Sequence, residues 1–403
     1  MTGVERTATR VRGFTSTEMD FQLMRMLGAA NAGGGTPGEI FAARGQIPEG
    51  DPYAWPAAFG EMADQLMAMA RDCLGKNHRH RAAGHLLRAS SYYRSAEYYS
   101  DPFGPQNPIY GQASRAAFLQ AAPLLPHRIQ AIDIPFEGHA LPGYFMQPAG
   151  EANGRTLIII TGFDGTAEEL YFQSAAAGLE RGYTLVIAEG PGQVGCLRRH
   201  PDLTFRPDYE APIRAMVDAT LGLPGVDPAR LALYGISFGG YFALRGASHD
   251  PRIRALVANS PITDLGAYMR GFTESADNNE HAGEDLPLSE VDEVPDEMLP
   301  RVDKLGFKSA CRRFGVDSFF GWFAALEDYC VTNLPDIHCP VLALVGTGEG
   351  DQAMKQFEQC AQSVSGPVTR RVFTVNEGAD MHCQLGNLPL SNAVIYDWLD
   401  DTL

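Results

Sequence analysis

The sequence predicts an α/β fold in which helices cover both faces of a mostly parallel sheet, with a helical region ahead of it. From residue 128 onward, short apolar runs alternate with helical segments, which is typical of parallel sheets. Before residue 128 the apolar spacing is helical, without strand-like alternation. A Gly-x-Ser-x-Gly sequence joins a predicted strand to a predicted helix near the middle of the chain.

Residues 1–127 are predicted to form a separate helical domain. Apolar residues at helical spacing predict helices over 18–30, 55–74, 82–99 and 114–121. Methionine and aromatic residues at this spacing usually pack in a core. We therefore expect these helices to cover another part of the chain, or alternatively to form the interface of a homodimer.

The second predicted domain, residues 128–403, carries the sheet. Its first two strands read as a hairpin, and the later ones as continuous apolar runs of buried parallel strands. The predicted strands are 129–136, 140–146, 156–160, 183–188, 231–234, 253–258, 341–345 and 371–375. The predicted helices are 168–180, 209–221, 352–360 and 391–399, with a further helix directly after residues 235–239.

An insertion over about residues 264–335 interrupts this alternation. Residues 274–297 are rich in acidic residues and contain no Lys or Arg, which predicts a mobile loop. Residues 302–329 carry aromatic residues at helical spacing and are predicted to be helical. We expect the insertion to form a cap over the functional site.

Composition limits the partners that we expect. The chain has 403 residues with a net charge of −17, which argues against nucleic acids and anionic membranes. Residues 1–20 lack an apolar signal-peptide core, and seven scattered cysteines without a Cys-x-x-Cys pair indicate reduced thiols in a cytoplasmic protein. The glycine-rich turn 189–193 matches no phosphate-binding pattern. We expect no cofactor and no metal.

The segment Gly235-Ile236-Ser237-Phe238-Gly239 has the context of a nucleophile elbow. It follows the apolar run 231–234 and precedes a helical segment. Such a sharp turn exposes a serine oxygen at the C-terminal end of a strand, and its glycines leave room for close packing of strand and helix. Ser237 is therefore the predicted nucleophile.

A general base and an acid are expected in the order Ser, acid, His along the chain. His382 lies just past the last predicted strand, as the base should. Two carboxylates, Glu349 and Asp351, follow the strand 341–345. The spacing strand-Gly-x-x-acid favours Glu349, whereas Asp is the usual acid by type and Asp351 is also placed to cap the next helix. Both remain candidates.

An oxyanion formed at Ser237 needs two backbone N–H donors. The amide of Phe238, directly after the nucleophile, is the first predicted donor. The second should come from the turn 161–165, which follows the strand 156–160. We choose Phe163 by position, with Asp164 as the alternative.

Several segments resemble one subfamily of α/β-hydrolases. They are Gly162–Leu170, Glu189–Gln193, Phe205–Glu210, Gly235–Tyr241, Glu377–Gln384 and, in the helical region, Leu86–Arg94. The subfamily includes 2,6-dihydropseudooxynicotine hydrolase and the fungal yellowish-green pigment hydrolases that shorten polyketides. The resemblance covers nearly the whole chain and implies an α/β-hydrolase fold.

The resemblance also implies a reaction. A triad containing Ser237 would hydrolyse a carbon–carbon bond next to a ketone through an acyl-enzyme, with a β-diketone or polyketide-like small molecule as substrate. Two alternatives use the same triad: a carboxylesterase or thioesterase, and a polyketide chain-releasing or condensing enzyme.

Overall fold

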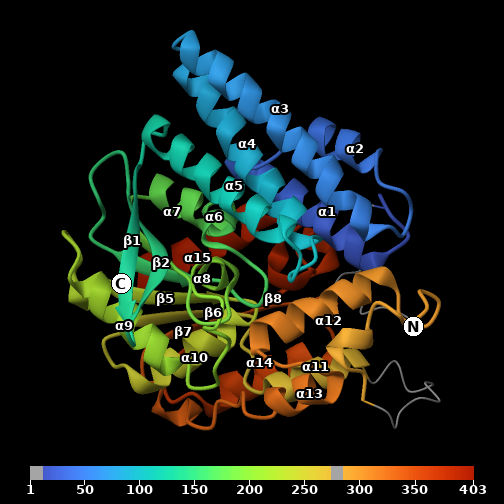
Figure 1. The fold of residues 1–403 in the computed structure, drawn as a ribbon. Helices are drawn as coiled ribbons and strands as arrows, with labels where there is room; N and C mark the ends of the chain where they lie inside the picture. The colour runs from blue at the N-terminus through green and yellow to red at the C-terminus, as the bar shows by residue number, and fades with distance from the viewer. Residues whose placement is uncertain (1–11, 274–284) are drawn as a thin grey trace.

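An eight-stranded sheet forms the centre of the computed structural model, which describes residues 12–273 and 285–403 (Figure 1). The strand order is β1-β2-β4-β3-β5-β6-β7-β8. Its strands are β1 Arg128–Phe136, β2 His139–Gln147, β3 Thr156–Ile160, β4 Thr184–Ala188, β5 Leu231–Ile236, β6 Ala255–Asn259, β7 Val341–Gly346 and β8 Val368–Phe373. The β1–β2 and β2–β4 pairs are antiparallel and all others are parallel, so the predicted fold class is confirmed.

Helices surround this sheet. Those before β1 are α1 Thr17–Ala29, α2 Pro37–Arg44, α3 Trp55–Gly75, α4 Arg79–Tyr98 and α5 Gln106–Ala121. Those between β3 and β6 are α6 Ala167–Leu170, α7 Ala176–Glu180, α8 Val194–Arg199, α9 Glu210–Leu221 and α10 Gly239–His249. The remaining helices are α11 Leu265–Thr273, α12 Arg301–Phe314, α13 Phe319–Leu326, α14 Asp351–Ser363 and α15 Leu388–Thr402. A π-helical turn, Tyr171–Ala175, joins α6 to α7.

The two faces of the sheet are covered by different helices. Side chains of α9, α10 and α14 pack on one face, and side chains of α6, α7 and α15 pack on the other (Figure 1). In β3, Ile158 and Ile160 face the first group, whereas Leu157 and Ile159 face the second. Alternate side chains of one strand are thus buried on opposite faces, which explains why its sequence is continuously apolar.

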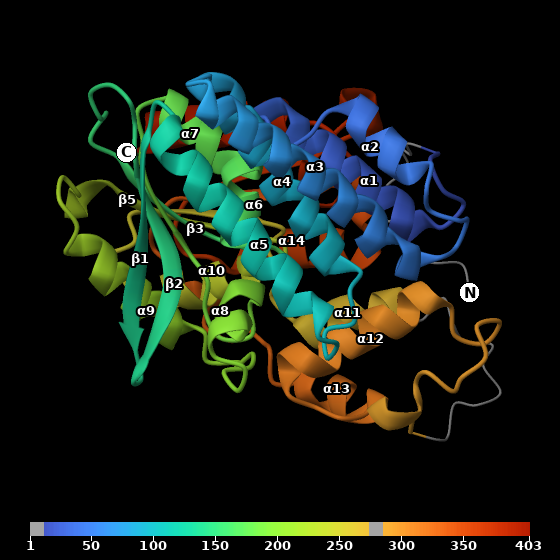
Figure 2. The ribbon, with the colours of Figure 1, turned by 45° about the horizontal axis from the view of Figure 1, so that its top comes forward.

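The helices α1–α5 have a core of their own and also cover the sheet domain. Their core is centred on buried aromatic side chains, among them Trp55 and Phe59, and it includes Leu305 from α12. Leu86 of α4 and Phe118 of α5 instead join the core on the α6–α7–α15 face. Figure 2 shows the resulting layer, with α12 lying along its edge. The division at residue 127 into two domains stays a prediction.

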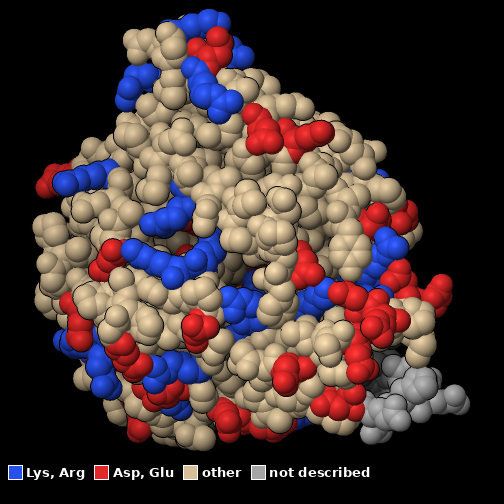
Figure 3. Space-filling view, viewed as in Figure 1, with Lys and Arg blue, Asp and Glu red and all other residues tan. Residues whose placement is uncertain are grey.

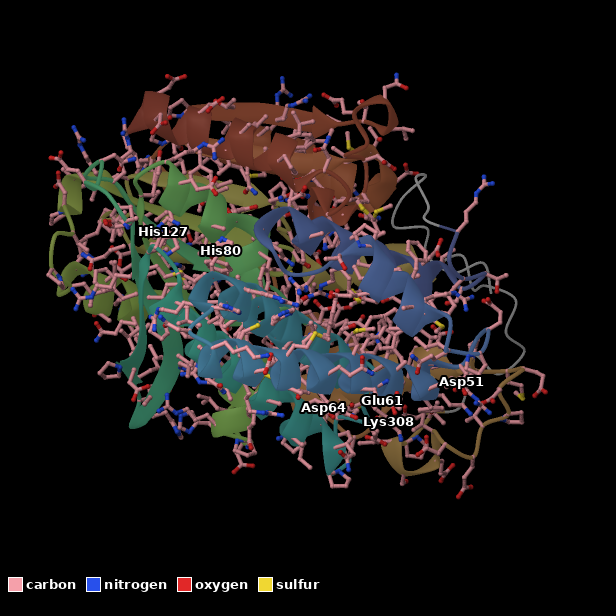
Figure 4. The ribbon with its side chains drawn as sticks, turned by 90° about the horizontal axis from the view of Figure 1, so that it is seen from above. Asp51, Glu61, Asp64, His80, His127 and Lys308 are labelled. Carbon is pink, nitrogen blue, oxygen red and sulfur yellow. The ribbon has the colours of Figure 1, made fainter. Side chains whose placement is uncertain are left out.

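Charged side chains line the border between α12 and the N-terminal helices. Arg301 pairs with Asp51 at 3.2 Å, and Lys308 pairs with Asp101 at 2.8 Å. Figure 4 labels Asp51 and Lys308 on this side of the molecule. Figure 3 shows basic side chains gathered across the middle of one face, at the level that α8 and α12 occupy in Figure 1. In the part of the chain that the structure describes, no helix combines the length and the apolar character that crossing a membrane requires.

The structure departs from the predicted elements in identifiable places. The segment predicted to be helical over 302–329 forms two helices, because Gly315 takes a left-handed conformation (φ 69°) that ends α12, and Ser318 then caps α13. The last strand ends at Phe373, not at residue 375, because Thr374 begins a capping box with Glu377. Helices α2, α8 and α11 were not predicted. Part of the predicted acidic loop, residues 274–284, lies outside the described residues.

Candidate active site

Ser237 lies in a tight turn between β5 and α10. Its backbone is in the left-handed region, with φ at 61°, which a non-glycine residue seldom adopts. A Cβ atom on Gly235 would lie 2.0 Å from the carbonyl oxygen of Gly239, so no side chain fits at that position. The strand, the strained serine and the glycine contact together match the predicted nucleophile elbow.

His382 and Glu349 continue from Ser237 as one chain of hydrogen bonds. The Nε2 atom of His382 lies 2.8 Å from the Ser237 hydroxyl oxygen. The Nδ1 atom of His382 lies 2.5 Å from Oε2 of Glu349. The three residues follow β5, β7 and β8, and the C-terminal ends of these parallel strands lie at the same edge of the sheet. This edge is where open α/β sheets place their functional residues.

The Glu349 carboxylate is buried, with 4% of the residue exposed, and is held by two further donors. The Ser260 hydroxyl donates to Oε2 at 2.5 Å, and the Gly346 amide donates to Oε1 at 2.7 Å. Ser260 was not among the predicted site residues. It directly follows β6, so the strand-end reasoning that located the other three residues would have found it.

Asp351 occupies a different environment from Glu349. It is exposed and is the first residue of α14, one position inside the predicted cap, where a carboxylate favours the helix dipole. The structure therefore brings Glu349 to His382 and leaves Asp351 at the surface. The catalytic roles of these residues stay predictions.

The surroundings of His382 favour its charged form. Burial by itself lowers the pKa of His382, whereas the Cys383 sulfur and the Glu349 carboxylate raise that pKa, and the net effect is a pKa above the ordinary value. Cys383 is buried, with its Sγ atom 3.5 Å from the carbonyl oxygen of Asn259. A cationic imidazole next to a carboxylate is the state that follows proton abstraction from a serine.

The predicted oxyanion turn, residues 161–165, packs directly against the elbow. A Cβ atom on Gly162 would lie 2.6 Å from the amide nitrogen of Phe238, so only glycine allows this approach. Within the described residues, neither the Phe238 nor the Phe163 amide donates a hydrogen bond to the protein. The carboxylate of Asp164 pairs with Arg25 at 3.2 Å. The amides of Phe238 and Phe163, two of the predicted donors, are thus free to bind an oxyanion beside Ser237.

Aromatic rings surround this turn. The Phe163 ring stacks near Phe205 with 6.0 Å between centroids, and Phe205 lies 5.1 Å from Phe314 at the end of α12. Phe238 lies 5.5 Å from Tyr329. Side chains from the core and the insertion thus make the surroundings of this turn largely apolar, and electrostatic interactions are stronger in such surroundings than in water. Among the described residues, no group of three His, Cys, Asp or Glu side chains is placed to hold a metal ion.

Known proteins resemble this chain over most of its length. Residues 54–269 match the family described as esterase FrsA-like. The chain is 37% identical to hydrolase ORFZ of Pyricularia oryzae, over 96% of this chain and 97% of that protein. It is 30% identical to hydrolase LUC6 of a Fusarium species, with the same coverage of both chains.

Among solved structures, the chain matches 2,6-dihydroxy-pseudo-oxynicotine hydrolase with a TM-score of 0.72 and 22% identity, over 94% of this chain and 95% of that one. A likeness at this identity supports the α/β-hydrolase fold, including the helices before the sheet. The family match and the two fungal relatives confirm the resemblance found in the sequence. The chain belongs to the FrsA-like esterase family of α/β-hydrolases.

Proposed function

We propose that this hydrolase uses Ser237 to cleave a carbon–carbon bond next to a ketone. The proposed substrate is a β-diketone or a polyketide-like small molecule. The observation that carries the proposal is the continuous hydrogen-bonded chain from Ser237 through His382 to Glu349, beside two free amides. The name of the solved hydrolase of 2,6-dihydroxy-pseudo-oxynicotine and the apolar, aromatic surroundings support a ketone substrate.

In the first step, His382 takes the proton of the Ser237 hydroxyl through Nε2 while the serine oxygen attacks one ketone carbon. Glu349 keeps Nδ1 of the imidazole protonated and stabilises the imidazolium that results. The oxyanion of the tetrahedral intermediate accepts hydrogen bonds from the amides of Phe238 and Phe163, with Asp164 as the alternative donor.

In the second step, the bond between the attacked carbon and the neighbouring methylene carbon breaks. Its electron pair moves to the methylene carbon and forms an enolate, which the second carbonyl stabilises. His382 returns its proton to this carbon, and a ketone leaves. Water, activated by His382, then hydrolyses the acyl-Ser237 ester and releases a carboxylic acid.

A plain esterase or thioesterase remains the second candidate, because the same three residues catalyse acyl transfer and the matched family is described as esterase FrsA-like. A chain-releasing or condensing enzyme is a variant of this candidate, in which a nucleophile other than water accepts the acyl group. The leaving atom distinguishes the candidates: carbon in the first, and oxygen or sulfur in the second.

Product analysis tests the proposal. The purified protein is incubated with benzoylacetone and polyketide-like β-diketones, and in parallel with phenyl acetate as a matched ester, in isotope-labelled water. Cleavage of a diketone should release a ketone and a labelled acid, which mass spectrometry identifies, and Ser237→Ala should release neither. Turnover of phenyl acetate without cleavage of any diketone would favour the esterase.

A further inference from the structure

Four consecutive backbone carbonyls in the turn 161–164 are held by side chains from three distant parts of the chain. Gln193, after β4, donates through Nε2 to the carbonyl of Thr161 at 2.6 Å and to that of Gly162 at 3.3 Å. Arg313, on α12, donates through Nε to the carbonyl of Phe163 at 2.9 Å. Arg94, on α4, donates to the carbonyl of Asp164.

These bonds set the direction of the amides in the same turn. In a planar trans peptide the carbonyl and the N–H of one unit point in opposite directions. Holding the carbonyl of Gly162 therefore fixes the N–H of Phe163, and holding the carbonyl of Phe163 fixes the N–H of Asp164. These two amides are the candidates for the second oxyanion donor.

We infer that Gln193 and Arg313 are positioning residues, named here the turn clamp, that aim the amide of Phe163 or Asp164 at the oxyanion. The inference rests on the proposed function, because it assigns the clamp to the oxyanion step at Ser237. The clamp also gives the insertion a role in catalysis, since Arg313 belongs to α12.

The environment of Arg313 supports a role beyond packing. The residue is 9% exposed, and in the described part of the chain no carboxylate forms an ion pair with it. Burial lowers the pKa of its guanidinium to about 10. Its charge lies over the Phe163 ring, 4.9 Å from the centroid. The other hydrogen bonds of Arg313 go to the carbonyl and the hydroxyl of Ser309, and the Asp164 and Glu97 carboxylates attract it from a greater distance. This buried cation is thus held by neutral acceptors, and it places positive charge beside the turn that meets the oxyanion.

The contacts of Gln193 also support a positioning role. It is fully buried, and its side-chain oxygen accepts from the Gly190 amide at 2.6 Å. The Gly190 bond settles the orientation of the side-chain amide, because a backbone N–H can only donate, so the side-chain nitrogen must point to the carbonyls of the turn. The residue thus presents a fixed donor to the carbonyls of Thr161 and Gly162.

The test compares Arg313→Gln and Gln193→Met with a matched control in the full-length protein. Arg312→Gln is the control, since Arg312 is adjacent on α12 and also donates to a backbone carbonyl, that of Pro201 at 2.7 Å. The probes are p-nitrophenyl acetate for kcat and KM, and a trifluoromethyl ketone, which forms a tetrahedral adduct with serine. Labelling of Ser237 with a fluorophosphonate tests the nucleophile independently.

Each clamp variant should lose about 10- to 100-fold in kcat, with KM changed by less than about twofold. Affinity for the trifluoromethyl ketone should fall by the same factor, because the adduct uses the oxyanion donors. Arg312→Gln should match the wild type. Arg313→Lys, which keeps the charge and one donor, should recover part of the loss, and it replaces Arg313→Gln if that variant does not fold.

Wild-type kcat in both clamp variants would overturn the inference. So would a loss of kcat without a parallel loss of affinity for the trifluoromethyl ketone. If the wild-type protein itself does not react with the fluorophosphonate at Ser237, the proposed function fails instead. The two failures are therefore distinguishable.

Discussion

Two turns meet at the candidate active site, and they are built in different ways. The turn after β5, which carries Ser237, is set by its own residues: a left-handed serine and glycines where no side chain fits. The turn after β3, residues 161–165, takes its shape from side chains that belong to α4, α12 and the segment after β4. The proposed nucleophile is thus encoded by a short motif, whereas the turn proposed to stabilise the oxyanion depends on residues from several parts of the fold.

The largest expected effect comes from removing the groups at the first turn. Ser237→Ala and His382→Ala should each lower kcat by on the order of 10⁶, because the two groups act as one unit in the attack. For the same reason the double variant should be scarcely worse than either single variant. Steady-state kinetics on folded protein, verified by circular dichroism, gives the answer. Substantial turnover by Ser237→Ala would exclude the covalent mechanism.

Removal of the carboxylate behind the first turn should cost less. Glu349→Gln should lower kcat by on the order of 10⁴, since the imidazole loses the group that orients it and stabilises its cation. The protein should still react, slowly, with a fluorophosphonate at Ser237. An unchanged kcat in this variant would show that another carboxylate is the partner of His382.

The pH dependence of kcat/KM gives a second test of the contact between Glu349 and His382. Because the pKa of His382 is raised, its imidazole stays protonated to higher pH than an ordinary histidine, and the neutral base forms only above that pH. In the wild type, kcat/KM should therefore rise with pH through a limb above the usual histidine range. Glu349→Gln removes one cause of the raised pKa and should move this limb to lower pH. A limb that does not move would assign the raised pKa to other neighbours.

The smallest effect is expected at Asp351, two residues from Glu349. Asp351→Asn should leave kcat within about twofold of the wild type, because the side chain is exposed at the start of α14. Loss of its charge from the helix N-terminus should lower the free energy of unfolding by about 0.3–1 kcal/mol. Kinetics and denaturant titration measure the two effects. A loss of activity comparable to that of Glu349→Gln would reverse the assignment of the acid.

The sequence predicted the parts of the site that depend on strand order. Ser237, His382 and the turn with Phe163 each follow a strand, and parallel strands bring their C-terminal ends to one edge whatever the loops do. Hydrophobic runs are continuous in these strands because both faces are buried, so the strands were found with errors of a few residues at their ends. The choice between Glu349 and Asp351 stayed open, because the two carboxylates are only two positions apart and the sequence does not reveal which side chain points toward His382.

The side chains that hold the turn 161–165 could not be predicted in the same way. Arg313 and the carbonyl that it binds are 150 residues apart, and Arg94 is 70 residues from its acceptor. Arginines at such positions look like ordinary helix-surface residues until the helices are placed. Carbonyl acceptors leave no trace in the sequence, since every residue has one.

The position of Leu305 limits how this enzyme could be recombined with its relatives. This side chain belongs to α12, yet it packs in the core formed by α1–α5. A chimera that exchanges only the insertion would set a foreign side chain into that core and leave a void or a clash. Chimeras designed to alter the substrate range should therefore exchange the insertion and helices α1–α5 together.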